Sequence, residues 1–343
     1  MRRFLFLTVM AVGRLSAGLG RLWGAEPADR PLNVPMPTLG GKQFWADEFF
    51  FHQWRIQHNV LTGHYRLLDE NDYRQAWGTF DDCRAVLERI KVARRLPPMR
   101  GKAVILLHGL FRSHDAMTKF GKYLQEQGGY VVFSITYPST QSGAAEHAQS
   151  LARIVAGLEG IEEINFVAHS MGNIVVRQYL ADLKRPDPRF RRMVMLAPPN
   201  HGSLAAVVAA ENVIFKTLTG EAGQELGAQW SLLEKRLAVP SIEFGIIAGG
   251  KQDGRGFNPL LPGDNDGVIG VDTTRLAGAA DFAVLPALHT FIMNDAKVQE
   301  YTLRFLQHGH FLSAKQRRPL AATAPSPQGG SATATPTSPQ LPP

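Results

Sequence analysis

A serine lies between two small residues where an apolar run meets a helical pattern. The segment reads Ala168-His169-Ser170-Met171-Gly172 and follows the apolar run that begins at Ile164. A serine hydroxyl becomes a strong nucleophile when it is exposed and paired with a base. A sharp turn between a strand and a helix exposes it, and that turn requires small residues two positions before and after the serine. The pattern therefore predicts Ser170 as a nucleophile; an ordinary helix N-cap is the alternative.

A second motif directly follows another apolar run, Ala103–Leu107, and reads His108-Gly109-Leu110. In a strand–turn–helix layout of this kind, the loop after that strand gives one backbone N–H to an oxyanion hole. The residue after the nucleophile gives the other, so Leu110 and Met171 are the predicted donors. Gly109 lets the backbone approach a substrate closely. We expect the remaining motif residues to shape the site, namely His108, Gly109, His169 and Gly172.

The elements that must position these residues alternate between two patterns. Apolar runs typical of buried strands occur at Ala103–Leu107, Tyr130–Thr136, Ile164–Ala168, Met193–Leu196, Ile242–Ala248 and Phe282–Leu285. Helical patterns occur at Asp115–Gln127, Ala144–Leu158, Met171–Leu183 and Asp295–Leu306. This alternation predicts an α/β fold with a mostly parallel central sheet and helices on both faces.

Two segments depart from the alternation. Gly40–Pro98 is rich in aromatic and charged residues, and we expect it to form an N-terminal extension (about 40–98) with early strands and a helix around Asp82–Val92. Ser203–Arg236 carries an apolar helical face between two expected strands. A structureless loop of that length is improbable in a compact domain, so an inserted helical lid is predicted, with packed helical decoration as the alternative.

The composition is that of a globular protein, with 343 residues, 44% hydrophobic residues, 20% charged residues and a net charge of +7. The single cysteine, Cys83, excludes an intramolecular disulfide framework and a zinc site built on several cysteines. The mild positive charge permits contact with an anionic membrane surface. No motif in the chain indicates binding to nucleic acid, and none resembles a phosphate-cradling loop.

Both ends of the chain differ from its middle. Residues 1–25 combine two early arginines with an apolar run and are predicted to be a signal peptide or membrane anchor. The protein is therefore expected to be exported or membrane-associated, with a cytoplasmic location as the alternative. Residues 313–343 consist mostly of Ala, Pro, Ser, Thr, Gln and Gly, so a disordered tail is predicted. Residues 26–312 remain for the folded domain.

Together these motifs resemble those of the α/β-hydrolase superfamily, and within it those of bacterial lipases and esterases with alanine in the first position of the nucleophile elbow. The run Pro198-Pro199-Asn200-His201-Gly202-Ser203 is similar to a turn in many lipases. The resemblance covers about Lys102 to Phe311. It implies the chain order serine, acid, histidine for a catalytic triad.

That order restricts the acid and the histidine that could pair with Ser170 to residues that follow it in the chain. Asp266 lies in Asn265-Asp266-Gly267-Val268-Ile269, which is similar to the run that holds the acid in related lipases, and Asp264 is the alternative. His289 stands between an expected strand and the closing helix, where the family places its catalytic histidine. The later histidines, His308 and His310, lie at the edge of the expected tail.

The resemblance implies a serine hydrolase that cleaves carboxylic, lipid-like esters through an acyl-enzyme, with no cofactor and no metal. An ester or lipid substrate and a membrane surface are the expected partners. Two alternatives stay open at this point. The same triad could transfer the acyl group to another acceptor or cleave an amide or thioester. A non-catalytic module of the same fold would instead bind a lipid or a partner protein.

Overall fold

The computed structural model describes residues 36–37, 42–203, 225–227 and 229–321. Every described residue belongs to one compact unit within Pro35–Pro343. The expected signal peptide, most of the expected lid and residues 322–343 of the expected tail lie outside the described residues. Export or membrane attachment through residues 1–25 therefore stays a prediction. Within the described ranges, no helix combines the length and apolarity that crossing a bilayer requires.

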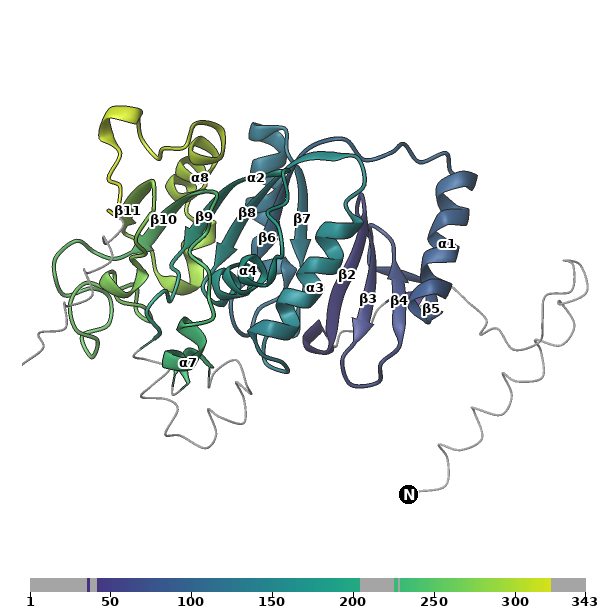
Figure 1. The fold of residues 1–343 in the computed structure, drawn as a ribbon, viewed down its shortest axis with the longest axis horizontal. Coiled ribbons are helices and arrows are strands. Elements are labelled where there is room, and N and C mark those ends of the chain that lie inside the picture. The colour runs from purple at the N-terminus through teal and green to yellow at the C-terminus, as the bar shows by residue number, and fades with distance from the viewer. Residues whose placement is uncertain (1–35, 38–41, 204–224, 228, 322–343) are drawn as a thin grey trace, which may run out of the picture. The chain divides into compact units, whose positions relative to one another are not determined.

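A parallel sheet of six strands carries the motifs (Figure 1). Its order is β11-β10-β9-β8-β6-β7, and all of its ladders are parallel. Because both faces of the sheet are covered, its central strands read as continuous apolar runs. The strands are β6 (Gly101–Leu107), β7 (Val131–Ile135), β8 (Ile161–His169), β9 (Phe190–Leu196), β10 (Glu243–Gly249) and β11 (Asp281–Leu285).

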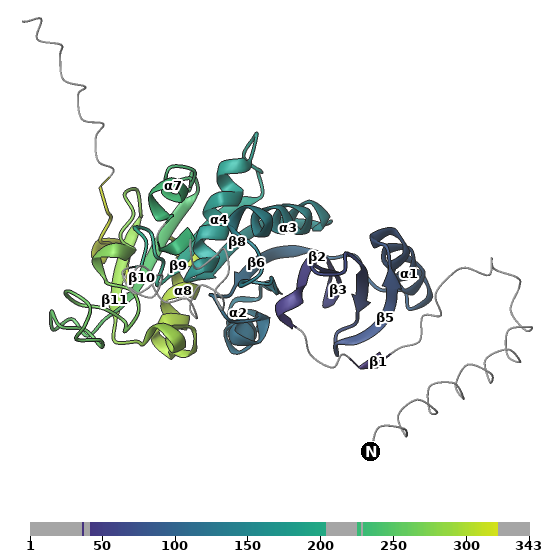
Figure 2. The ribbon, with the colours of Figure 1, turned by 90° about the horizontal axis from the view of Figure 1, so that it is seen from below.

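Helices cover both faces of this sheet, as Figure 2 shows. The helices α3 (Ala144–Gly157) and α4 (Met171–Asp182) lie on one face, and α2 (Thr118–Gly128) and α8 (Ala296–His308) lie on the other. A short helix, α7, spans Trp230–Glu234. The short 3₁₀ helices are η2 (Lys42–Phe44), η3 (His114–Met117), η4 (Asp272–Thr274), η5 (His289–Asn294) and η6 (Ala314–Gln316).

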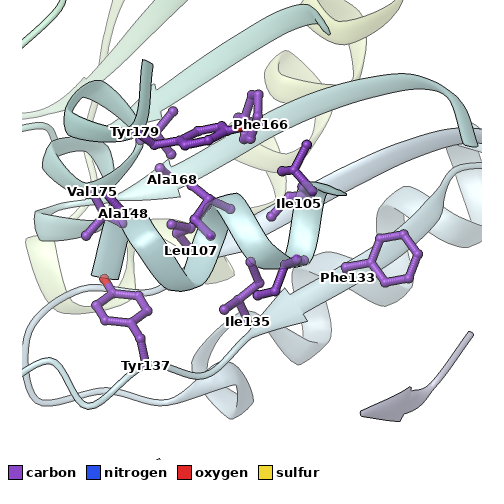
Figure 3. Packing of buried hydrophobic residues seen from close by; sticks show 14 of the residues in the cluster. Ile105, Leu107, Phe133, Ile135, Tyr137, Ala148, Phe166, Ala168, Val175 and Tyr179 are labelled. Atoms are coloured by element: carbon purple, nitrogen blue, oxygen red, sulfur yellow. The ribbon is translucent and has the colours of Figure 1, made fainter. Parts of the chain in front are cut away.

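Alternate residues of β6 enter the two layers of the core. Ile105 and Leu107 pack in the layer beneath α3 and α4, as Figure 3 shows, whereas Val104 and Leu106 pack in the layer beneath α2 and α8. This division follows from the two-residue period of a strand, which sends successive side chains to opposite faces. The end of β6 is therefore held from both sides, and this end leads into the His108-Gly109-Leu110 loop.

The segment that departs from the alternation forms a second sheet. Its five strands are antiparallel in the order β1-β5-β4-β3-β2. They are β1 (Met36–Pro37), β2 (Trp45–Phe51), β3 (Trp54–Asn59), β4 (Tyr65–Leu68) and β5 (Tyr73–Gly78). The helix α1 (Phe80–Ala93) begins with a capping box in which Thr79 and Asp82 bond each other's backbone N–H groups. It buries Cys83 and Leu87 in the core.

The second sheet meets the parallel sheet at the end of β7. The Asp47 N–H donates to the Thr136 carbonyl at 2.9 Å, and the Thr136 N–H donates to Asp47 Oδ2 at 2.6 Å. The Phe50 and Phe133 rings meet edge to face with centroids 5.5 Å apart. These contacts place the N-terminal extension against the β7 edge of the parallel sheet.

The sequence predicts a disordered tail from Ser313, and for residues 313–321 this prediction is wrong. The Leu320 N–H donates to the Ala279 carbonyl and the Gly278 N–H donates to the Leu320 carbonyl, both at 2.9 Å. The Arg318 N–H also donates to the Asp281 carboxylate at 2.9 Å. These bonds use the backbone of the segment, whereas a composition rule registers only its side chains. A polar segment is thereby held against the edge of the sheet.

Candidate active site

Ser170 occupies the turn between β8 and α4. Its φ of 52° and ψ of −123° are values that residues other than glycine rarely adopt, and such strain persists where the surrounding structure enforces it. The Ser170 N–H donates to the Leu196 carbonyl at 2.9 Å. A Cβ at Gly172 would lie 2.8 Å from the His108 carbonyl oxygen and from Leu107 Cβ. Glycine at this position therefore lets the start of α4 pack against the end of β6.

The structure brings the predicted nucleophile, base and acid together. His289 Nε2 lies 3.0 Å from Ser170 Oγ, and His289 Nδ1 lies 2.7 Å from Asp266 Oδ2. Because a carboxylate only accepts, Nδ1 carries the proton and Nε2 presents its lone pair to the serine hydroxyl. The exposed fractions are 7% for Ser170, 9% for His289 and 1% for Asp266, so the serine–histidine end is the more accessible one.

A tight turn aims the Asp266 carboxylate at His289. Its Oδ1 accepts from the Val268 N–H at 3.0 Å and from the Ile269 N–H at 2.7 Å, which leaves Oδ2 for the imidazole. Gly267 permits the turn with a φ of +99°. The His289 N–H also donates to the Asp266 carbonyl at 2.9 Å, so the turn holds both the side chain and the backbone of the histidine.

Asp264, the alternative acid, has a different position. Its carboxylate accepts from the backbone N–H groups of Lys251 and Gln252, each at 2.8 Å, and of Asn265 at 3.1 Å. These bonds tie the loop after β10 to the loop that carries Asp266. The structure thus gives the two carboxylates separate partners, with only Asp266 bonded to the imidazole of His289.

The two backbone N–H groups predicted to stabilise an oxyanion, those of Leu110 and Met171, have no acceptor among the described residues. Met171 begins α4, where the helix dipole favours negative charge. The next N–H along the chain, that of Phe111, is already bonded to Ser139 Oγ at 3.1 Å. A Cβ at Gly109 would lie 2.9 Å from His169 Nδ1, so glycine allows this loop to approach the nucleophile.

Two buried histidines support the site as neutral groups. His108 stacks on Tyr137 with ring centroids 4.1 Å apart, and burial lowers the pKa of His108 to about 3. His169 Nε2 lies 3.0 Å from the His289 carbonyl oxygen and donates to it. Burial, followed by the charge of His289, holds the pKa of His169 well below its usual range. His169 thus fixes the backbone of His289, the candidate base.

A cavity of about 230 Å³ opens at Ser170. Its described lining is mostly apolar, with one permanent cation, Arg112, which the motif analysis does not identify. The lining residues are Leu110, Phe111, Arg112, His169, Ser170, Pro199, Ser203, Leu226, Val268, Ile269, His289 and Thr290. Arg112 has no sequence signal of its own, because a single arginine in a loop is most often a solvated surface residue. Across the described ranges, no three His, Cys, Asp or Glu side chains are grouped as a metal site would require.

The arrangement can move a proton from a hydroxyl to an imidazole while a carboxylate holds the imidazole and balances its charge. The hydroxyl would then attack an electrophilic carbon in the cavity. The two N–H groups of Leu110 and Met171 are available for the oxygen on which charge develops.

The comparison with protein families finds one match. Residues 102–226 match the family model described as alpha/beta hydrolase fold. This range contains β6 to β9, Ser170 and both predicted oxyanion donors. No curated protein matches the chain.

The solved structures that match this chain include a lipase, a phospholipase and a carboxyl esterase. The mature lipase of Bacillus licheniformis is 21% identical, with 57% of this chain and 88% of that chain covered and a TM-score of 0.41. A phospholipase of Legionella pneumophila is 17% identical, with 60% of each chain covered and a TM-score of 0.44. A metagenomic carboxyl esterase is 19% identical, with 57% of this chain and 66% of that chain covered and a TM-score of 0.43.

Proposed function

We propose that this protein, which has the α/β-hydrolase fold, is a serine hydrolase that cleaves carboxylic esters through an acyl-enzyme. The observation that carries the proposal is the continuous hydrogen-bonded chain from Ser170 Oγ through His289 to Asp266, which ends at a cavity. The strained backbone at Ser170 supports it, since such strain gathers at functional sites. Asp266, rather than Asp264, is the proposed acid.

The first half of the reaction forms the acyl-enzyme. His289 Nε2 takes the proton of Ser170 as Oγ attacks the ester carbonyl carbon, and the carbonyl oxygen becomes an oxyanion. The Leu110 and Met171 N–H groups stabilise that charge. As the tetrahedral intermediate collapses, the bond from carbon to the alcohol oxygen breaks, and Nε2–H gives its proton to the departing alcohol. Asp266 stabilises the imidazolium throughout and stays ionised.

The second half releases the acid. Water replaces the alcohol, gives a proton to His289 Nε2 and attacks the acyl carbon, so a second oxyanion forms in the same hole. Collapse breaks the bond between the acyl carbon and Ser170 Oγ, and the proton returns to the serine. The neutral, fixed His169 keeps the His289 backbone in place during both halves.

The apolar part of the cavity wall suits an acyl chain. Apolar side chains from the Leu110 loop and from the Val268–Ile269 turn form its wall beside Ser170. Burying methylene groups against such a wall contributes about 0.8 kcal/mol for each CH₂. We therefore propose lipid-like esters as substrates, with activity that increases with acyl length until the chain exceeds the cavity.

A chromogenic ester series from short to long acyl chains tests the proposal. Wild type, Ser170→Ala and Ser134→Ala are compared on purified, folded protein; Ser134 lies in β7 and its hydroxyl donates to the His114 carbonyl, away from the cavity. We expect turnover by wild type and Ser134→Ala and a loss of about 10⁴-fold or more in Ser170→Ala. Full activity in Ser170→Ala, or no turnover by wild type on any chain length, would overturn the proposed function.

A further inference from the structure

One side chain in the cavity wall does not fit a purely apolar substrate. Arg112 is half-buried and lines the cavity together with Ser170 and His289. The only hydrogen bond of its side chain within the described residues is from Nη2 to the Thr290 carbonyl, at 3.3 Å. A guanidinium has five N–H donors, so most of the donating capacity of Arg112 is unused.

Two other half-buried arginines, Arg189 and Arg304, have carboxylate partners. Arg189 Nη2 lies 2.7 Å from Asp187 Oδ2, and Arg304 Nη2 lies 2.6 Å from Glu300 Oε1. No carboxylate lies within ion-pair distance of Arg112 among the residues that the structure describes. Because partial burial of an unpaired charge is unfavourable, an arginine at this position indicates a partner that arrives from outside the chain.

Among the described residues that line the cavity, none is a carboxylate that could neutralise Arg112. The carboxylate of Asp266, the acid of the triad, already accepts hydrogen bonds from His289, Val268 and Ile269. The charge of Arg112 reaches the site, because it adds to burial and to the His289 charge in lowering the pKa of His169. An anionic group that entered the cavity would therefore meet an unbalanced positive field.

We propose that Arg112 determines substrate specificity by binding an anionic oxygen group, a phosphate or a carboxylate, on the alcohol side of the ester. This inference rests on the proposed function of the same site. The acyl chain lies along the apolar wall formed by Leu110, Val268 and Ile269. The anion accepts a forked pair of hydrogen bonds from the guanidinium, a geometry that phosphates and carboxylates match.

The loop that carries Arg112 is fixed from both sides. The Arg112 carbonyl accepts from Gln43 Nε2 at 2.9 Å, and its side chain bonds the residue next to His289. The guanidinium is thus held at a set position relative to the triad. A preorganised donor of this kind binds an anion with little ordering cost.

The test compares matched esters that share one acyl chain. A 1-acylglycerol 3-phosphate carries the phosphate, a 3-acyloxypropanoate carries a carboxylate, and a 1-acylglycerol is neutral. Each is supplied as monomer at constant ionic strength, and release of the fatty acid is measured. The variants are Arg112→Gln, Arg112→Lys and Arg100→Gln; Arg100 is an exposed arginine before β6, so its replacement removes the same charge outside the cavity.

We expect Arg112→Gln to lower kcat/KM on an anionic ester by about 10- to 100-fold, mainly through KM, because the variant loses charge-assisted hydrogen bonds to the anion; this loss equals about 1.4–2.8 kcal/mol. Its kcat/KM on the neutral ester should change by less than about threefold. Arg112→Lys should retain part of the preference, because it keeps the charge and loses the fork. Arg100→Gln should behave as wild type on all three esters. The anionic ester with the larger dependence on Arg112 identifies phosphate or carboxylate as the ligand.

Equal losses on the anionic and neutral esters would overturn the inference, because a structural bond to Thr290 alone predicts that pattern. Wild type without any preference for the anionic esters would also overturn it while the proposed hydrolase activity stands. If wild type cleaves no ester, including the neutral one, the proposed function itself fails, and the inference with it.

Discussion

Two of the buried carboxylates, Asp47 and Asp266, belong to polar networks that end differently. In the N-terminal sheet, Asp47 accepts from Gln57 Nε2 at 2.7 Å and from the Thr136 N–H at 2.6 Å, and Gln57 accepts from Arg66 at 2.7 Å. In the parallel sheet, Asp266 and His289 lead outward to Ser170. Both carboxylates are almost completely buried.

The difference lies in the last group of each network. The Asp47 network closes within the protein, because Arg66 also covers the Trp45 ring at 3.7 Å and packs inside the sheet. The Ser170 network ends on a hydroxyl at a cavity, beside two N–H groups without acceptors in the described structure. A buried carboxylate is therefore a structural group in one place and a candidate catalytic group in the other. Unused hydrogen-bonding capacity at a cavity distinguishes them.

Replacing Asp266 by asparagine should break the network that runs from Asp266 through His289 to Ser170. Of the changes described here, we expect this one to have the largest effect. The amide can donate to His289 Nδ1, which selects the tautomer that protonates Nε2 and removes the base for Ser170. We expect kcat to fall by about 10³- to 10⁴-fold with little change in unfolding by urea. The matched variant Asp264→Asn loses backbone bonds and should lower stability while kcat per folded molecule is retained. Similar kcat values for the two variants would contradict the assignment.

Replacing Asp47 by alanine should instead break the network in the N-terminal sheet, which joins Asp47 to Gln57 and Thr136. The change leaves the Thr136 N–H and the Gln57 amide N–H without this acceptor in a buried place, and it removes the carboxylate that lies 3.9 Å from Arg55 Nε. We expect a loss of about 3 kcal/mol in the free energy of unfolding, measured with urea. Ester hydrolysis per folded molecule should stay within about threefold of wild type. A large loss of activity in a protein of unchanged stability would show that the two networks are coupled.

The smallest expected effect is on the dependence of folding stability on pH, to which the buried histidines contribute. Burial lowers the pKa of His147 to about 4, against 6.5 for an unperturbed imidazole. Between these values the unfolded chain binds a proton that the folded chain does not, so stability falls as the pH falls through this window. One such group contributes a slope of up to about 1.4 kcal/mol per pH unit.

His147→Gln should therefore flatten the dependence of stability on pH. Urea unfolding at pH 7.5, 6 and 5 measures the slope for wild type and for the variant. His108 and His169 keep their own contributions, because burial lowers their pKa values as well. An unchanged slope would mean that His147 is protonated in the folded protein.

Much of the site was predictable because its chemistry depends on local spacing. Ser170 follows from the small residues around it. The chain order of a triad restricts its partners to later residues, and the resemblance to related lipases then points to Asp266 and His289. The resemblance also pointed to the hydrolase fold, which the match over residues 102–226 confirms. The alternation of strand and helix predicted the parallel sheet, because strands covered on both faces are continuous apolar runs.

Other features depend on contacts that no local pattern records. Arg112 becomes notable only when the fold places it beside Ser170 without a carboxylate partner. The backbone bonds of Leu320 hold a segment whose composition suggested a tail. The edge contact between Asp47 and Thr136 joins residues far apart in the chain, and composition alone did not reveal it.

The most direct test of the central claim is covalent labelling with a fluorophosphonate. In an activated serine, Oγ attacks phosphorus, the P–F bond breaks, and fluoride and the hydroxyl proton are released while a stable phosphonate ester forms. The full chain is treated with the reagent, and the modified peptide is located by mass spectrometry. The account predicts a single adduct on Ser170 that is absent in Ser170→Ala and forms at least about 10³-fold more slowly in His289→Gln. No adduct on the folded wild type, or an adduct on another serine, would contradict it.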